Sequence, residues 1–300
     1  MTLIVIGGAT ATGKSDLAVD LAERIGAQIV NADSMQLYRG MDIGTAKMTM
    51  EERRGVAHHM LDLIEVSTDA NVSWYQGQAR AKIDELLAES IPVIVVGGTG
   101  LYIKAILDDL NFPDTDPVVR AKLEVEAEHI GGDALHQRLG ILDPAAAAAI
   151  PKENIRRVVR ALEVIEITGK PFTANLPREN STRYPKALQF GLEMDRDQLD
   201  LRVDLRVERM FERGLVNEVD TLIKRGILEA RTARAALGYA QVIAMRAGDI
   251  SEGDAITLTK LATRQYIRRQ ETWFRRDQRI TWLEADSDRL GAIEKAILNA

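Results

Sequence analysis

A glycine-bordered loop near the start of the chain has the spacing that binds phosphate. Gly8 to Ser15 reads GATATGKS and matches the pattern G-x-x-x-x-G-K-[ST], between an expected strand and an expected helix. Backbone N–H groups of such a loop surround the oxygens of a di- or triphosphate, the lysine neutralises charge, and the serine hydroxyl reaches a magnesium ion. The residues expected to bind phosphate are Gly8, Thr10, Ala11, Thr12, Gly13, Lys14 and Ser15. The motif predicts nucleotide or ATP binding as readily as another phosphate compound, because kinases, GTPases and other transferases share it.

Asp33 follows the second expected strand, at the end where open parallel sheets bind ligands. This position makes it a candidate general base or magnesium partner; the alternative is an aspartate that caps the following turn. The third expected strand ends in Gly97-Gly98-Thr99-Gly100, where ATPases and GTPases commonly have an acidic residue. A second glycine loop that carries a hydroxyl indicates either close approach of a ligand or a tight turn.

The charge of the chain is unevenly distributed. The formal net charge of −6 argues mildly against a nucleic-acid partner. Between Ile256 and Trp282, however, the chain has seven basic residues and only two acidic ones. Of the basic residues, Lys260, Arg264, Arg268 and Arg275 fall on one helical face. A second basic run contains Lys152, Arg156, Arg157 and Arg160. Each run predicts either a surface for a polyanion or an ordinary solvated face, and spacing alone favours the ordinary face for the 256–282 segment.

The elements that position these residues form an α/β pattern. Short β-branched runs are expected as strands at Leu3 to Ile6, Gln28 to Asn31 and Pro92 to Val96, with helices at Ser15 to Gly26 and Trp74 to Glu89. We therefore expect a P-loop NTPase-like parallel sheet flanked by helices. Residues 1–113 would be the first part of this core, 114–185 a mainly helical insertion domain, and 186–300 the last core strand and C-terminal helices.

Within the later parts, the sequence predicts further elements. Helices are expected at Val118 to His129, Arg156 to Thr168, Leu199 to Arg225 and Thr257 to Arg276, a strand at Gln189 to Met194, and an exposed loop at Asn175 to Pro185. The longest apolar runs are about five residues, far short of the roughly 20 that cross a bilayer. With no cysteine, no basic leader and four scattered histidines, we expect a cytoplasmic protein without a disulfide, zinc site or membrane helix, and a monomer by default.

Taken together, the motifs resemble the tRNA dimethylallyltransferase (tRNA isopentenyltransferase) family nearly end to end. The stretches that carry the resemblance are Gly8 to Ser15, Asp33 to Lys47, Gly97 to Tyr102, Arg156 to Val164, Leu237 to Tyr239, Thr263 to Tyr266, Arg268 to Gln270 and Thr272 to Phe274. The segment DSMQLYRGMDIGTAK, from Asp33 to Lys47, is the most discriminating, because nucleotide kinases lack it.

The resemblance implies transfer of a dimethylallyl group from its diphosphate to the N6 amine of the adenosine 3′-adjacent to the anticodon, with magnesium. On this analogy Lys14 and Ser15 act on the diphosphate and its metal ion, and Asp33 is the general base. Ser34, Met35, Gln36 and Thr99 would contact the target base, and Thr99 also the diphosphate. Contacts with the tRNA anticodon stem-loop would come from Arg156, Arg157, Val158, Val159 and Arg160 in the insertion, and from Arg264 and Arg268.

One position departs from the family pattern. An arginine is expected three residues before the Gly238-Tyr239 pair, where this chain has Ala235; Arg234 is the nearest candidate to reach the diphosphate. Two alternatives remain at this point. One is a P-loop small-molecule kinase that uses ATP, and the other is a tRNA-binding protein with an inactive site, which the presence of Lys14, Ser15 and Asp33 disfavours.

Overall fold

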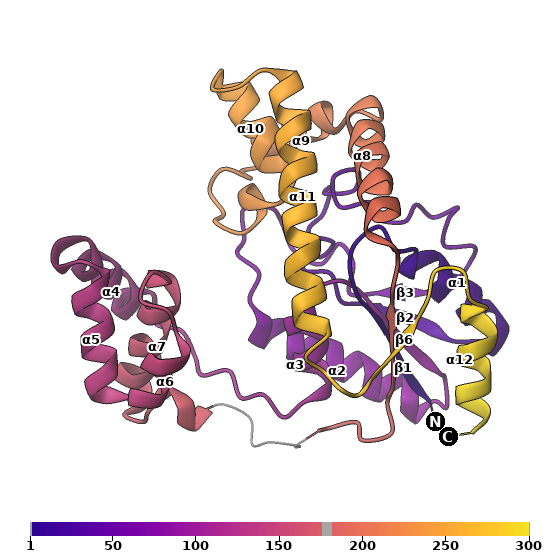
Figure 1. Cartoon of the computed structure of the whole chain (residues 1–300), viewed down its shortest axis with the longest axis horizontal. Helices are drawn as coiled ribbons and strands as arrows, with labels where there is room; N and C mark the ends of the chain where they lie inside the picture. The colour runs from indigo at the N-terminus through magenta and orange to yellow at the C-terminus, as the bar shows by residue number, and fades with distance from the viewer. Residues whose placement is uncertain (1, 176–181, 300) are drawn as a thin grey trace. The chain divides into compact units, whose positions relative to one another are not determined.

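The computed structural model describes residues 2–175 and 182–299, which form two compact units. The first unit combines Met1–Leu107 with Tyr184–Ala300, and the second is Asp108–Arg183 (Figure 1). The expected loop from Asn175 to Pro185 lies partly outside the described residues. No helix in the described part of the chain has the length and apolar content that crossing a membrane requires.

A parallel sheet is the centre of the first unit. Within the described residues it has six strands in the order β3-β2-β4-β1-β5-β6. Their bounds are β1 Leu3–Gly7, β2 Gln28–Asn31, β3 His58–His59, β4 Val93–Val96, β5 Leu188–Leu192 and β6 Ile280–Leu283. Ile4 of β1 pairs in parallel with Ile94 on one side and Leu188 on the other. Because parallel strands end at the same edge, the segments that follow β1, β2 and β4 lie together.

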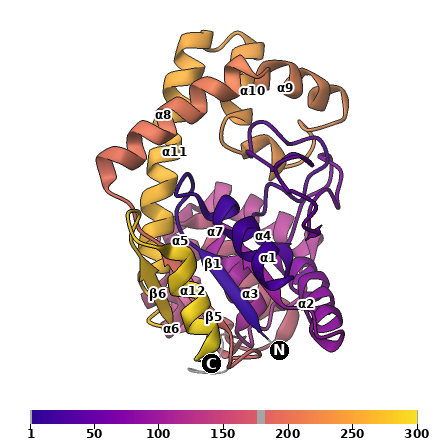
Figure 2. The same ribbon diagram turned by 90° about the vertical axis from the view of Figure 1, so that its right-hand side faces the viewer.

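Side chains that alternate along these strands face two separate layers of helices. Ile4 and Ile94 pack with α1 (Lys14–Ile25) and α12 (Arg289–Leu298), which lie side by side (Figure 2). Val5 and Val95 pack on the other face with α2 (Val72–Ala88) and α3 (Gly100–Leu107). Both faces of the sheet are thereby buried, as the continuous apolar runs of the strands predict.

A group of helices completes the first unit: α8 Arg196–Glu212, α9 Leu215–Lys224, the short 3₁₀ helix η2 Ala233–Ala235, α10 Tyr239–Ala247 and α11 Glu252–Phe274. The expected single helix from Leu199 to Arg225 is wrong, because Gly214 takes a φ of 96° and separates α8 from α9. Only glycine adopts this conformation at little cost. The strand expected at Gln189 to Met194 is β5, but it is not the last strand of the core, because β6 follows it in sequence. β6 is short and only partly buried, so its sequence signal is weak.

The second unit is helical and has its own core. Its elements are α4 Pro117–Ile130, α5 Gly132–Leu142, α6 Pro144–Ala149, α7 Ile155–Thr168 and the 3₁₀ helix η1 Phe172–Asn175. Glu163 of α7 is fully buried and accepts hydrogen bonds from Arg120 and Arg160. A buried carboxylate needs such partners, so Arg160 is part of this unit's internal structure.

Candidate functional site

The phosphate-binding loop connects β1 to α1 and is held in shape by its own groups. Thr12 donates its hydroxyl proton to the Ala9 carbonyl at 2.9 Å, and the Lys14 ammonium group donates to the same carbonyl. Gly13 takes a φ of 88° at the start of α1. The loop therefore directs its backbone towards the N-terminal end of a helix, which favours an anion.

Loop and strand ends surround a pocket of about 610 Å³. Among its lining residues are Thr10, Lys14, Ser15, Asp33 and Gln36 from the predicted set. Residues that sequence analysis did not assign also line it, among them Arg202, Arg206, Arg209, Tyr266 and Gln270. The pocket thus brings a phosphate cradle, a carboxylate and several cations together.

Asp33 lies in this pocket, and its side chain also caps the turn that follows. Its Oδ1 accepts the Met35 N–H at 2.9 Å, and the Asn31 side chain donates to the Asp33 carbonyl at 3.0 Å. Burial raises the pKa of the Asp33 carboxyl, while the Met35 N–H and the cations Lys14 and Arg206 act in the opposite direction. A carboxylate with a raised pKa is a stronger proton acceptor than a solvated one.

Lys14 is buried among charges of both signs. Burial lowers its pKa to about 7; the nearby Arg206 guanidinium contributes in the same direction and Asp33 opposes it. A lysine in this state gains a proton readily when an anion arrives, because the anion favours the charged form.

Arg206 of α8 is a site residue that sequence analysis missed. Its Nη1 donates to the Thr10 hydroxyl at 3.2 Å, so a residue 196 positions away in sequence contacts the phosphate loop. Arg202, Arg206 and Arg209 recur at intervals of four and three residues, the spacing of one helical face. This periodicity is the sequence feature from which Arg206 could have been found.

Arg234 does not take the expected place. Its guanidinium donates to the Leu228 carbonyl at 3.2 Å, and it is absent from the described residues that line the pocket. The prediction that Arg234 reaches the phosphate site is therefore corrected: Arg206 lies there instead.

The two glycine loops are joined by Gln270 of α11, which is 5% exposed. Its Oε1 accepts the Thr10 N–H at 2.9 Å, and its Nε2 donates to the Gly98 carbonyl at 2.8 Å. Gly97 leaves no room for a Cβ, which would collide with the backbone of Ala32. The Thr99 hydroxyl accepts the Ser34 N–H at 3.1 Å, so these two predicted residues are adjacent, although neither lines the pocket.

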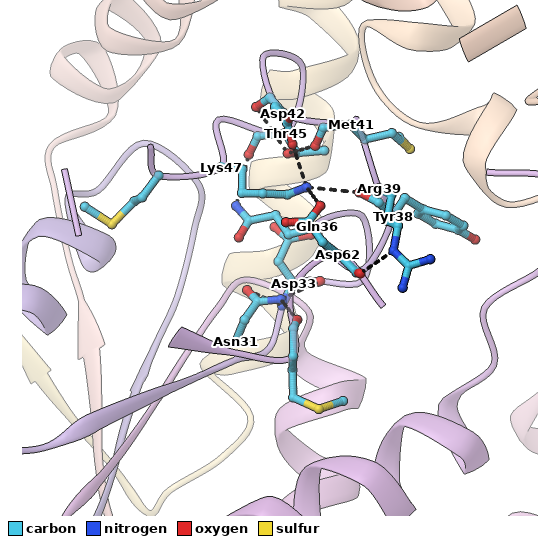
Figure 3. A network of polar contacts seen from close by, with 12 residues as sticks. Asn31, Asp33, Gln36, Tyr38, Arg39, Met41, Asp42, Thr45, Lys47 and Asp62 are labelled. Atoms are coloured by element: carbon cyan, nitrogen blue, oxygen red, sulfur yellow. Dashed lines mark hydrogen bonds and ion pairs between the residues drawn. The ribbon is translucent and has the colours of Figure 1, made fainter. Parts of the chain in front are cut away.

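The segment 33–47 is held by an internal polar network (Figure 3). Lys47, 3% exposed in its side chain, donates to Asp42 at 2.7 Å, to Asp62 at 2.6 Å and to the Tyr38 carbonyl at 3.0 Å. Three partners satisfy the three donors of the ammonium group. The network fixes a segment that has almost no regular secondary structure and whose Gln36 side chain lines the pocket.

The oxygen groups of the pocket fit a divalent cation that binds together with a phosphate ligand. In residues 2–175 and 182–299, no three His, Cys, Asp or Glu side chains are grouped so as to hold a metal ion. The pocket does contain the Ser15 hydroxyl at the start of α1. Because magnesium commonly binds one or two protein oxygens plus substrate phosphates, these residues fit a cation that arrives with its ligand.

The predicted tRNA-contacting residues are not equivalent. Val158 and Val159 are buried in the core of the second unit, so the prediction that they contact a ligand directly is wrong. Arg156 and Arg157 are exposed. Arg160 donates to Glu163 and to the carbonyls of Pro113 and Asp114.

On α11, the expected line of cations is largely paired with acidic residues. Arg264 forms an ion pair with Asp204 of α8 at 2.5 Å, and Lys260 pairs with Glu208 at 2.5 Å. Arg268 is exposed. Lys260 and Arg264 are thus neither a free cationic stripe nor a solvated face: both are half-buried and paired with acidic residues of α8.

Comparison with known proteins finds relatives that all belong to one family. Residues 36–277 match the family model described as IPP transferase. The chain is 56% identical to the tRNA dimethylallyltransferase of Thermobifida fusca, over 95% of this chain and 91% of the relative, and 55% identical to that of Streptomyces coelicolor, over 94% and 89%. No support appears for the kinase alternative.

Solved structures agree. The tRNA isopentenylpyrophosphate transferase of Bacillus halodurans matches with a TM-score of 0.72 and 38% identity, over 99% of this chain and 96% of that one. A eukaryotic dimethylallyltransferase acting on tRNA matches with a TM-score of 0.81 and 26% identity, over 99% of this chain and 77% of that one.

Proposed function

The chain belongs to the IPP transferase family, and we propose from this premise that it transfers a dimethylallyl group from dimethylallyl diphosphate to tRNA. The acceptor would be the exocyclic N6 amine of the adenosine 3′-adjacent to the anticodon. The observation that carries the proposal is the joining, in one pocket, of a phosphate-binding loop with Arg206 and a carboxylate of raised pKa, Asp33.

The diphosphate would bind to the backbone N–H groups of residues 10–15, with Lys14 and Arg206 neutralising its charge. Thr99, whose hydroxyl accepts the Ser34 N–H, would contact either the diphosphate or the base. A magnesium ion would be held by the Ser15 hydroxyl and diphosphate oxygens. When bound, it stabilises the negative charge of the leaving group.

In the reaction, the N6 lone pair attacks C1 of the dimethylallyl group. The C1–O bond breaks, and its electron pair leaves with the diphosphate, where Lys14 and Arg206 stabilise the added charge. The amine proton passes to Asp33. Since a carboxylate of raised pKa accepts a proton more readily than a solvated one, the burial of Asp33 favours this step.

The target adenine must leave its stack to reach the pocket. Gln36, Ser34 and Met35 are suited to contact it, because they follow Asp33 directly. The exposed Arg156 and Arg157 of the second unit supply positive charge for the phosphates of the anticodon arm. We propose that the protein acts as a monomer in the cytoplasm, where unmodified tRNA is met.

The first experiment is incubation of the purified protein with unmodified tRNA, magnesium and dimethylallyl diphosphate, followed by mass analysis of the nucleosides. Substrates with adenosine at, and beside, the position 3′ of the anticodon report the site. A gain of one dimethylallyl group on that adenosine is the expected result. No gain, with ATP hydrolysed or a small molecule phosphorylated in parallel reactions, would reject the proposal in favour of a kinase.

A further inference from the structure

Glu218, in the first turn of α9, receives four hydrogen bonds from one loop and one tyrosine. Its Oε2 accepts the N–H of Asp42 at 3.2 Å and of Ile43 at 2.8 Å, and its Oε1 accepts the N–H of Gly44 at 3.3 Å. The Tyr239 hydroxyl donates to the same Oε1 at 2.5 Å. One carboxylate thus satisfies three successive backbone donors that no helix or strand satisfies.

The surroundings make this contact specific. The N-terminal turn of a helix favours a negative charge, which suits a carboxylate at Glu218. Tyr239 is fully buried, and burial raises the pKa of its phenol, so it remains a proton donor. Its ring occupies the space that a Cβ on residue 44 would need, so only glycine lets the loop approach.

The loop held by Glu218 continues directly into the pocket. Ile43 and Thr45 line it, whereas Glu218 and Tyr239 are not among its described lining residues. The Thr45 carbonyl accepts a hydrogen bond from Gln36 Nε2 at 3.2 Å and lies 3.5 Å from Arg206 Nη2. A displacement of the loop at Ile43 would therefore move the group that orients the Gln36 amide.

We propose that Glu218, assisted by Tyr239, is a positioning residue that fixes the Thr45 carbonyl and thereby orients the Gln36 amide towards the target adenine. The inference rests on the proposed function, because Gln36 has a base to contact only if the pocket receives a nucleotide. Glu218 acts at a distance, through the backbone of residues 42–45.

A Glu218→Gln substitution tests this because it keeps the shape of the side chain. The amide group has one acceptor oxygen instead of two, and its NH₂ group would face an N–H or O–H donor. We expect kcat/KM for tRNA to fall by about 10- to 100-fold, as for other small misplacements of a site. The KM for dimethylallyl diphosphate should stay within about twofold, because Gln270 holds the phosphate loop and Arg206 keeps its bond to the Thr10 hydroxyl.

The decisive measurement is a double-mutant cycle with Gln36→Ala. If Glu218 acts through Gln36, Glu218→Gln should lower kcat/KM much less in the Gln36→Ala background than alone. Additive effects, or an equal loss caused by a fall in the folded fraction, would overturn the inference. Glu208→Gln is the matched control, because Glu208 is exposed and pairs with Lys260, and we expect it to keep full activity.

Should Glu218→Gln fail to fold, Tyr239→Phe runs the same cycle, since it removes a single hydroxyl donor; it should give a smaller loss with the same dependence on Gln36. A wild-type protein that transfers no prenyl group would reject the proposed function, and this inference with it. An active wild type with additive variants would reject the inference alone.

Discussion

The Arg206 guanidinium donates to the Thr10 hydroxyl at 3.2 Å, which attaches α8 to the phosphate-binding loop across 196 residues of sequence. Around this contact the pocket contains two cations, the buried Lys14 and the half-buried Arg206, close to the carboxylate of Asp33. Burial lowers the pKa of both cations, because holding a charged group in the pocket without an anion costs free energy. A bound diphosphate would relieve that cost.

Arg206→Ala should therefore raise the KM for dimethylallyl diphosphate. A hydrogen bond to a charged group is worth about 1.5–3 kcal/mol, or roughly 10- to 100-fold in affinity. Steady-state kinetics at saturating tRNA measures the change. Arg234→Ala is the matched control and should leave KM unchanged, because Arg234 bonds to the Leu228 carbonyl. The reverse result, with a defect only at Arg234, would restore the arginine favoured by the sequence.

Asp33→Asn should lower turnover by about 10²- to 10⁴-fold, the usual contribution of a general base, while tRNA affinity is nearly unchanged. Asparagine keeps an oxygen for the Met35 N–H but cannot accept the amine proton at neutral pH. Single-turnover rates and tRNA binding by fluorescence anisotropy separate the two effects. Normal turnover would remove Asp33 from the role of base.

The same substitution should stabilise the ligand-free protein at neutral pH. The folded pKa of Asp33 is raised, so folding favours its protonated form, and the protein loses this stability as pH rises through the folded pKa. Asparagine is neutral throughout, so its gain in Tm should be largest at neutral pH and shrink as pH falls towards 3.8, the ordinary value for Asp. A lower Tm at neutral pH would contradict this sign.

We expect the Lys14 side chain to take up a proton when diphosphate binds above pH 7. With a pKa lowered to about 7, the free side chain is largely neutral at pH 8, and the bound anion favours its charged form. Calorimetric titration in buffers of different ionisation enthalpy should show the uptake at pH 8 and much less at pH 6. Lys14→Met should abolish it; uptake that persists in this variant would assign the proton to another group.

Charge reversal at Arg156 and Arg157 should weaken tRNA binding and flatten its salt dependence. Each lost phosphate contact reduces the slope of log K against log salt concentration by about 0.9 in duplex regions. Lys122→Glu, on the same unit and paired with Glu166, serves as a control for net charge. Reversal at Arg160 should instead destabilise the second unit, because it leaves the buried Glu163 with one partner fewer. An unchanged slope would make Arg156 and Arg157 ordinary solvated residues.

The sequence alone determined the features that depend on neighbouring residues. The phosphate loop, the strands at β1, β2 and β4, and the end of α1 at Gly26 follow from apolar runs and glycine positions within a few residues of one another. The position of Asp33 at the carboxyl end of β2 follows for the same reason. The family resemblance rests on such contiguous motifs, and the comparisons confirm it.

Only the tertiary structure decided which distant side chains complete the site. Gln270 meets Thr10 across 260 residues, and Glu218 meets Ile43 across 175. Arg264, by contrast, is neutralised by Asp204. Spacing along a helix states which residues share a face, but the packing of that helix decides whether the face meets a pocket, an acidic neighbour or solvent. Which of several similarly spaced arginines lies in the site therefore depends on contacts between residues far apart in sequence, and no local sequence pattern predicts it.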